Sequence, residues 1–242
     1  MAKQSNILEL TGSIGNISFY KTKEGYRARQ KGGVTKKRIL TDPHYERTRE
    51  NNAEFGRATS AAKHIRHALA FSLAKAGDNT FHNRLKSLMV KVVQSDPISD
   101  RGERTVQIGD LDILQGLRLN KKRSLDGSLG QYVRIEKESG QLKFTLKNCN
   151  PELFQAPSST THFRLFAQGL RMNFEPFEFV KSLYETPLLP IETNGIDLSF
   201  DLKIEGDLPG KELFAVGLEF FQKLGDTPYP VAKKDFNVGE VV

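Results

Sequence analysis

The chain contains two adjacent strand-like segments, THFRLFAQGLRM at residues 161–172 and FEFVKSLYE at residues 177–185. Both are rich in the aromatic and aliphatic side chains that are typical of strands. Six further segments of this kind follow residue 104, and several of them alternate apolar and polar residues. They are TVQIGDLDILQGLRL (105–119), QYVRIEKES (131–139), QLKFTLKN (141–148), GIDLSFDLKIE (195–205), KELFAVGLEFFQKL (211–224) and KDFNVGEVV (234–242).

Turn signals separate these segments at Ser139-Gly140, Asn194-Gly195, Pro209-Gly210 and Gly225-Asp226. Seven or eight strands over roughly 110–140 residues predict an antiparallel β-sandwich, immunoglobulin-like in outline, at residues 98–242. The Cys…Trp…Cys signature of true immunoglobulin domains is absent, because the chain has no tryptophan and a single cysteine.

Residues 41–97 change to a helical period and predict a helical hairpin. Asp42-Pro43 has the pattern of an N-cap followed by a first-turn proline, and Gly77 is a stop signal. The first predicted helix, between Pro43 and Gly77, has one apolar stripe, and a second predicted helix after Gly77 has another. The two stripes are Phe55, Ala58, Ala62, Ile65, Leu69 and Leu73, then Phe81, Leu85, Leu88, Met89 and Val92 before Pro97. The early part of the first helix, HYERTRENNAE, has almost no apolar face, so we expect it to be frayed or covered by a partner.

Residues 1–40 predict a basic β-hairpin arm. The segment NISFYKTKEGYRARQKGG (16–33) places a two-residue loop at Glu24-Gly25, which pairs Lys23 with Tyr26 and Tyr20 with Arg29. One face of this hairpin is then polar, basic and aromatic. The predicted fold class is therefore α+β, with a hairpin arm, a helical hairpin and a β-sandwich in that order.

The charge of the chain is unevenly distributed. Among 242 residues, 36 Lys+Arg and 29 Asp+Glu give a formal net charge of +7. Residues 1–123 hold 24 basic and 12 acidic side chains, whereas residues 124–242 hold 12 and 17. The single cysteine excludes a disulfide framework, and no stretch has the roughly 18 apolar residues of a membrane helix. We expect a cytoplasmic protein without a signal peptide.

The sequence holds few signs of catalysis. Cys149 has no imidazole near it in sequence, and no Gly-x-Ser-x-Gly motif is present. His64 and His67 are one helical turn apart, but position 61, where a Glu-x-x-His pair needs its carboxylate, is alanine. We expect no catalytic residue, no metal and no cofactor.

Short-spaced acidic pairs and glycines have structural interpretations. Asp110/Asp112 and Glu205/Asp207 fit solvent-facing strand positions. Gly12-Ser-Ile-Gly15 lacks the lysine and the following helix of a phosphate-binding loop, so we expect it to bend the backbone beside the hairpin.

The strongest functional signal is the basic segment from residue 21 to 49, with tyrosines interleaved. Cations at this density repel one another unless an anionic or otherwise complementary partner lies nearby. The predicted binding surface consists of Tyr20, Lys21, Lys23, Tyr26, Arg27, Arg29, Lys31, Lys36, Lys37, Arg38, Arg47 and Arg49. One candidate partner is nucleic acid, because lysines and arginines neutralise phosphates and tyrosines stack on bases. A second is protein, either the acidic face of another copy's β-sandwich or another assembly component. A third interpretation is that the charges only keep a surface hairpin soluble.

Several of these stretches resemble a known group of sequences. The runs GSIGNISFYK (12–21), TDP (41–43) and RENNAEF (49–55) are similar to the opening of uncharacterised proteins found in Bacteroidetes genomes. VGLEFFQ (216–222) is similar to their closing strands. That family has no established activity, so the resemblance implies a layout and supplies no catalytic residue.

Two functional hypotheses follow from the sequence. The first is a non-enzymatic structural or adaptor subunit that assembles with itself or with a larger complex through its basic arm and long helix. The alternative is a sequence-nonspecific nucleic-acid-binding protein that uses the basic, tyrosine-containing hairpin. Neither hypothesis involves a membrane.

Overall fold

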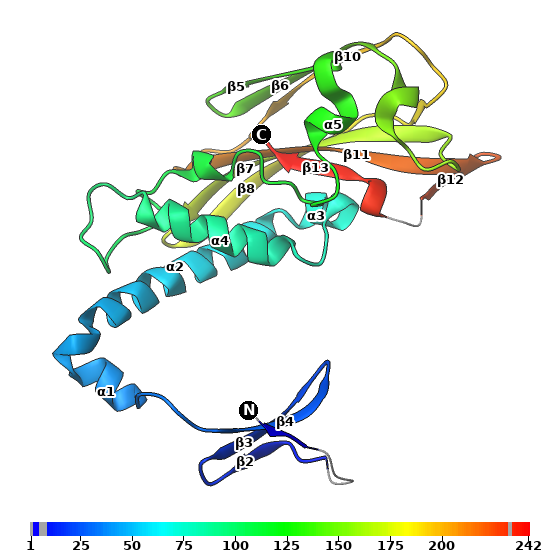
Figure 1. Ribbon diagram of the computed structural model, residues 1–242. Coiled ribbons are helices and arrows are strands. Elements are labelled where there is room, and N and C mark those ends of the chain that lie inside the picture. Colours follow the sequence, from blue (N-terminus) through cyan, green and yellow to red (C-terminus); the bar gives the residue numbers. More distant parts are fainter. Residues whose placement is uncertain (1, 5–8, 232–233) are drawn as a thin grey trace. The chain divides into compact units, whose positions relative to one another are not determined.

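The computed structural model describes residues 2–4, 9–231 and 234–242 (Figure 1). Helices and antiparallel sheets make up the chain, which confirms the α+β class. The chain forms two compact units, residues 1–49 and residues 50–242. The helices and strands after residue 49 thus belong to one unit, whereas the sequence suggested boundaries at residues 40 and 97.

The first unit is a four-stranded antiparallel sheet followed by short helices. Its strands are β1 (Ala2–Lys3), β2 (Gly12–Ile14), β3 (Ile17–Thr22) and β4 (Gly25–Gln30), in the spatial order β1-β4-β3-β2. The helix α1 (Lys36–Thr41) and the 3-10 turn η1 (Pro43–Tyr45) come next. The hairpin β3–β4 was predicted, whereas the outer strands β1 and β2 and the helix α1 were not.

The predicted register of the β3–β4 hairpin is wrong. Thr22 pairs with Gly25 and Tyr20 pairs with Arg27, so the loop is Lys23-Glu24. The Thr22 hydroxyl causes this, because it accepts from the Glu24 amide at 3.2 Å and donates to the Gly25 carbonyl at 2.8 Å. Gly25 then begins the second strand with a φ of 111°. The observed pairs have residue numbers that add up to 47, whereas the predicted pairs add up to 49. The pairing is thus shifted by two residues, and because side chains alternate with a period of two, each residue keeps its predicted face.

The predicted long helix is divided into separate elements. Asp42 caps η1, the main helix α2 runs over Glu46–Ala68, and α3 (Ala70–Ala76) follows a break at Leu69. Gly77 ends α3 as predicted. The second helix, α4 (Phe81–Gln94), also follows the prediction, with Asp78 accepting from the Thr80 amide just before it.

Two sheets make up the β-part of the second unit. The smaller sheet has the order β10-β6-β5, and the larger has the order β12-β11-β7-β8, with β13 paired to β11 and β9 paired to β7. Their strands are β5 (Val133–Glu138), β6 (Gln141–Cys149), β7 (His162–Phe174), β8 (Phe177–Glu185), β9 (Leu189–Pro190), β10 (Ile196–Lys203), β11 (Lys211–Leu224), β12 (Thr227–Pro230) and β13 (Val238–Val241). The short helical elements are η2 (Leu111–Leu114), α5 (Leu125–Leu129), η3 (Gly130–Tyr132), η4 (Pro151–Phe154) and η5 (Lys234–Phe236).

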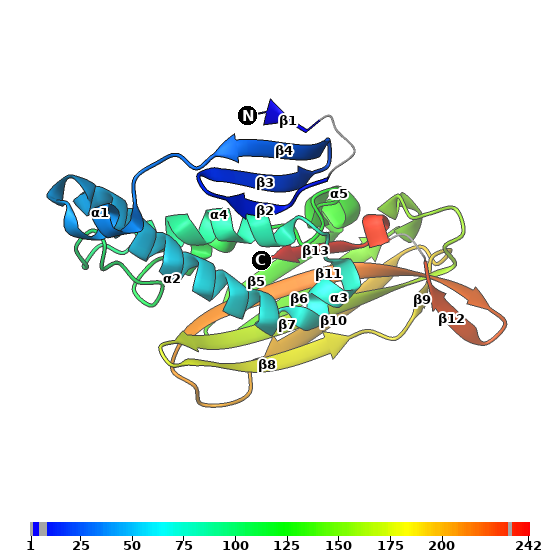
Figure 2. The ribbon, with the colours of Figure 1, turned by 90° about the horizontal axis from the view of Figure 1, so that it is seen from below.

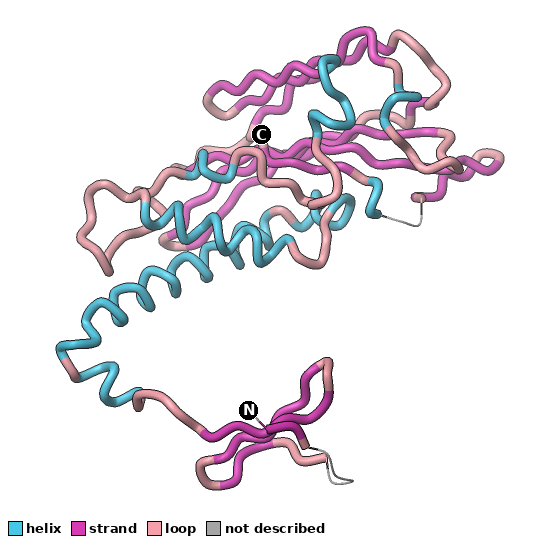
Figure 3. The backbone as a smooth tube through the Cα atoms, viewed as in Figure 1, coloured by secondary structure: helices cyan, strands magenta, loops and turns pink. Residues whose placement is uncertain are grey.

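The larger sheet lies between two other layers. Figures 2 and 3 show α3 and α4 along one face of the sheet and β5, β6 and β10 across the other. Phe166 and Leu170 of β7 pack on the helices, while Phe163 and Leu165 of the same strand pack on the smaller sheet. Since both faces are buried, β7 and β11 are nearly continuous apolar runs. The immunoglobulin-like outline stays a prediction.

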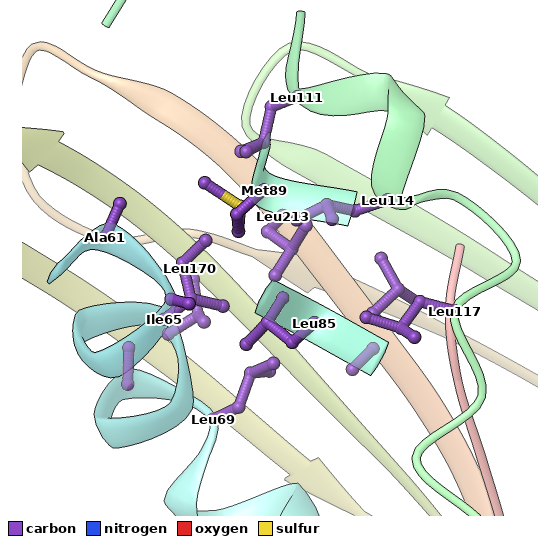
Figure 4. Packing of buried hydrophobic residues seen from close by; sticks show 14 of the residues in the cluster. Ala61, Ile65, Leu69, Leu85, Met89, Leu111, Leu114, Leu117, Leu170 and Leu213 are labelled. Atoms are coloured by element: carbon purple, nitrogen blue, oxygen red, sulfur yellow. The ribbon is translucent and has the colours of Figure 1, made fainter. Parts of the chain in front are cut away.

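The helix side of the sheet holds one continuous core. Figure 4 shows Ile65 of α2, Leu85 of α4 and Leu170 of β7 converging on this core. Leu111 and Leu114 of η2 close it from the far side of α4. These side chains fix the helices to the sheet by apolar burial.

Residues 105–119 do not form the predicted strand. Their leucines belong to turns and to η2, where Asp110 caps the first turn by accepting from the Asp112 amide at 2.9 Å. Leu111 and Leu114 recur at a spacing of three, which suits a 3-10 turn packed on α4 rather than an alternating strand.

The break in the long helix is occupied by a side chain from the central sheet. Gln168 of β7 is fully buried, and its Oε1 accepts from the Ser72 Oγ at 2.7 Å and from the Ser72 amide at 3.3 Å. Its Nε2 donates to the Ala68 carbonyl at 2.7 Å. The amide group of Gln168 therefore replaces the backbone hydrogen bond from Ser72 to Ala68 that a continuous helix would make.

We predict that Gln168→Met lowers the free energy of unfolding by about 2–4 kcal/mol, because it leaves the buried Ser72 donors and the Ala68 carbonyl without partners. Urea denaturation followed by circular dichroism measures the change. The matched control is Gln222→Met on β11, a half-buried position, for which we expect a change below about 0.5 kcal/mol. Equal losses in the two variants would contradict the role given to Gln168.

Candidate binding surfaces

The N-terminal sheet has one apolar face. The observed register places Phe19 opposite both Gly12 and Ala28, Ile17 opposite Ile14, and Ala2 opposite Ala28. Directly opposite residues share a face, so these side chains form a common surface. We call it the apolar face, and its members are Ala2, Ile14, Ile17, Phe19 and Ala28. Ile14 is 64% exposed and Ile17 is 44% exposed.

The opposite side of this sheet is cationic. The register joins Tyr20 to Arg27, Ser18 to Arg29, and Lys3 to Arg27 on the neighbouring strand. We call Lys3, Tyr20, Arg27 and Arg29 the cationic face. The Arg29 guanidinium lies 5.7 Å from the centre of the Tyr20 ring, and Arg27 forms an ion pair with Glu24.

The predicted binding residues are therefore not one surface. Lys21 and Tyr26 pair with each other on the side of the apolar face, where the Lys21 Nζ lies 5.1 Å from the Tyr26 ring centre. Lys23 is exposed in the hairpin loop. Lys31 donates from its Nζ to the Gly15 carbonyl at 3.2 Å and so closes the turn between β2 and β3.

Lys36, Lys37 and Arg38 share the exposed surface of α1. The Arg38 guanidinium is paired with Asp42 at 3.1 Å. Arg47 is exposed in the first turn of α2. These residues belong to the same unit as the cationic face, but they lie on helices rather than on its sheet.

Arg49 has an evident structural task. Its Nη1 donates to the carbonyls of Ile39 and Asp42, at 2.9 and 3.0 Å, and so binds the end of α1 to the start of α2. Hydrogen bonds from His44 hold the pKa of Asp42 below its usual value, with smaller contributions from Arg38 and Arg49. Arg49 thus has a structural role in addition to the contact role predicted for it.

The first unit has no core of its own. None of the described residues between 2 and 49 is fully buried, and every side chain of β1 to β4 is exposed or half-buried. A small sheet without buried side chains is only marginally stable in water. Burial of the apolar face would stabilise this sheet.

One side of the early part of α2 contacts the loop at residues 101–104. The Glu54 carboxylate accepts from the Gly102 amide at 2.9 Å, and the Arg57 Nε donates to the Arg104 carbonyl at 2.7 Å. Arg101 adds a hydrogen bond to Asn51 at 2.9 Å. The side chains of Asn51 and Glu54 thus bind the loop at residues 101–104, whereas Arg47, Asn52 and Ala53 are exposed. A partner on this exposed side of the helix stays a prediction.

The candidates for enzyme chemistry have structural roles. Cys149 is fully buried, and burial raises the pKa of its thiol to about 11. Gly12 and Gly15 both have positive φ angles, at the start of β2 and in the turn that follows it. This geometry agrees with the backbone role expected for the pair.

The helical histidines contact aromatic side chains of the larger sheet. The His64 ring stacks on Phe177 with the ring centres 3.9 Å apart, and His67 meets Phe179 edge-on at 5.9 Å. Burial lowers the pKa of His64, and neighbouring Lys63 and His67 lower it further. Within the described part of the chain, no group of three potential metal ligands occurs.

The comparisons with known proteins do not extend these observations. No protein-family model, no curated protein and no solved structure matches the chain. Among the described residues, no helix has the length and apolar character needed to cross a bilayer. The apolar face of the N-terminal sheet is the feature that sequence reasoning missed, although the alternation of Ile17 and Phe19 in β3 carried the signal.

Asp78 holds the connection between α3 and α4. Its carboxylate accepts from the Arg84 side chain at 2.9 Å, from the Thr80 amide at 2.7 Å and from the Lys121 amide at 2.8 Å. Burial alone would raise the pKa of Asp78, but these donors outweigh it and hold the pKa well below 3.8. The charged form therefore stabilises the fold.

We predict that Asp78→Asn lowers the free energy of unfolding at pH 7 by about 1–3 kcal/mol, because charge-assisted hydrogen bonds are lost. Since the folded-state pKa is depressed, the stabilisation is present above about pH 3.8 and disappears as the pH falls below that value. The gap between wild type and variant should therefore narrow in acid. Urea denaturation at pH 7 and in acid measures this difference in the free energy of unfolding. The control variant is Asp226→Asn in the β11–β12 turn. A difference between wild type and Asp78→Asn that does not change with pH would contradict the stabilising role of the Asp78 charge.

Proposed function

We propose that this protein is a cytoplasmic, non-catalytic assembly subunit that associates with a second copy of itself through the apolar face of the N-terminal sheet. The single observation that carries the proposal is the exposure of Ile14 and Ile17 on a sheet that has no buried side chain. Covering that face supplies the apolar burial that the isolated sheet lacks.

A second copy is a suitable occupant because the face is self-complementary. Two identical apolar faces can stack about a twofold axis, and each then serves as the core of the other. The strands β1 and β2 are the two edge strands of this sheet. Exposed edges of this kind favour association between chains.

Electrostatics favours the same arrangement. Arg27 and Arg29 lie on the side opposite the apolar face, so stacking would direct both cationic faces outward. Lys21 shares the side of the apolar face but lies over the Tyr26 ring near the hairpin loop. The arginines are thereby kept out of the proposed interface, and Lys21 lies at its hairpin end.

We predict that Ile14→Ser together with Ile17→Ser shifts the protein from dimer to monomer, because both exposed apolar side chains of the interface are replaced by polar ones. Analytical ultracentrifugation across a concentration series measures the shift. The matched control is Val34→Ser together with Leu40→Ser, since these residues are 39% and 58% exposed in the same unit but lie outside the sheet.

The control variant should associate like the wild type. A wild-type protein that is monomeric at every concentration would contradict self-association. Equal loss of association in both double variants would show that the apolar face has no special part in it.

The cationic face supports a second candidate function, nucleic-acid binding. Tyr20, Arg27 and Arg29 gather on one side of the sheet, where the arginines can neutralise phosphates and the tyrosine can stack on a base. This face remains outward in the proposed dimer, so the two functions are compatible.

We predict that Arg27→Gln together with Arg29→Gln weakens binding to single-stranded DNA and reduces the slope of log affinity against log salt by about 1.4. Fluorescence anisotropy at several salt concentrations measures both quantities. The control is Lys143→Gln together with Lys203→Gln on the smaller sheet, which removes the same charge elsewhere. Absence of binding at low salt, or equal effects of both variants, would remove this second function.

A further inference from the structure

The second unit contains a groove between α2 and α4 that neither proposed function uses. It has a volume of about 430 Å³. Its lining residues are Thr59, Ser60, Ala62, Lys63, Arg66, His82 and Lys86. The volume lies within the range of small-molecule sites rather than of extended macromolecular surfaces.

Both helices direct basic side chains to this groove. Thr59, Lys63 and Arg66 recur at spacings of four and three, so they share one face of α2. His82 and Lys86 are four residues apart and share one face of α4. Three permanent cations and one imidazole therefore surround a single concave surface.

In the described part of the chain, these cations have no ion-pair partner. Between residues 56 and 95 the sequence has one acidic residue, Asp78, and that residue is paired with Arg84. Among the residues that the structure describes, no carboxylate forms an ion pair with Lys63, Arg66 or Lys86. By contrast, Lys75 of the same helical layer is paired with Glu185 and Glu219 at 2.5 and 2.7 Å.

Two hydroxyl-bearing side chains, Thr59 and Ser60, also line the groove, and the Ser60 Oγ lies 3.5 Å from the His64 Nε2. The Thr59 Oγ1 is buried and has no hydrogen-bond partner, so it is not bound to the backbone of its own helix. Cationic and hydroxyl donors around one small concavity match an anion with several acceptor oxygens and more than one negative charge.

We propose that the α2–α4 groove binds a small ligand through its phosphate or pyrophosphate group. Arg66 supplies a planar fork of donors for two phosphate oxygens, and Lys63 and Lys86 supply point charges from the two walls. Ala62 is the one apolar residue among those that line the groove. The site lies in the second unit and does not depend on the N-terminal sheet.

Isothermal titration calorimetry of the full chain with pyrophosphate tests this proposal. We expect saturable binding to the wild type, and affinity weaker by about tenfold or more in Lys63→Gln together with Lys86→Gln, because charged hydrogen bonds are lost. The matched control is Lys91→Gln, since Lys91 is an exposed lysine of α4 outside the groove. It should change the affinity by less than about twofold.

A short oligothymidylate, titrated in parallel, distinguishes a small phosphorylated ligand from a nucleic-acid backbone. Binding of pyrophosphate that the double variant loses, with no matching loss of oligothymidylate binding, supports the proposal. Oligothymidylate binding without pyrophosphate binding overturns it, as does the absence of pyrophosphate binding at millimolar concentration. Equal weakening by Lys91→Gln also overturns it, and circular dichroism verifies that each variant is folded.

Discussion

The side-chain amide of Gln168 joins the helical layer to the central sheet at the one place where the long helix is interrupted. It takes the position of the missing backbone hydrogen bond between Ser72 and Ala68, from a strand that is buried on both faces. A buried amide is stable only when its donors and acceptors are satisfied, so the break and the strand fix each other's position. Ile65, Leu85 and Leu170 pack in the same helix-side core that lies beside this hydrogen-bonded break.

The N-terminal sheet differs from the second unit in how much apolar surface it buries. The second unit buries two continuous cores, whereas the first unit buries no described residue. Ile14 and Ile17 are exposed on one side of that sheet, and Arg27 and Arg29 lie on the other. Association through the apolar side would give the sheet a core and leave the cationic side for an anionic partner, which is why the two proposed functions are assigned to different faces.

The sequence predicted much of the second unit, because strong turn signals bound its strands. The segments 177–185 and 211–224 coincide with β8 and β11, and α4 (Phe81–Gln94) contains the predicted apolar stripe from Phe81 to Val92. The strand predicted for residues 105–119 is wrong because the leucines that pack from a 3-10 turn also resemble the apolar residues of a strand. Whether such a segment forms a strand or a 3-10 turn depends on which distant residues bury it, and this cannot be predicted from the local composition.

The candidate surface was predicted less well, for reasons of local chemistry. The faces of the hairpin were correct although the register was wrong, since the Thr22 hydroxyl moves the turn without changing the alternation. Arg49 was included in the predicted binding surface because of its charge, but its guanidinium donates hydrogen bonds to the carbonyls of Ile39 and Asp42. The groove at Lys63 and Lys86 was outside the reach of sequence reasoning, because it requires two helices to be brought together.

Hydrogen exchange of the N-terminal sheet at several protein concentrations tests the central claim, that this sheet is stabilised by association, most directly. Backbone amides of β3 and β4 should be protected at high concentration and lose that protection on dilution, while amides of β7 and β11 stay protected throughout. Protection of β3 and β4 that is the same at every concentration would contradict the account.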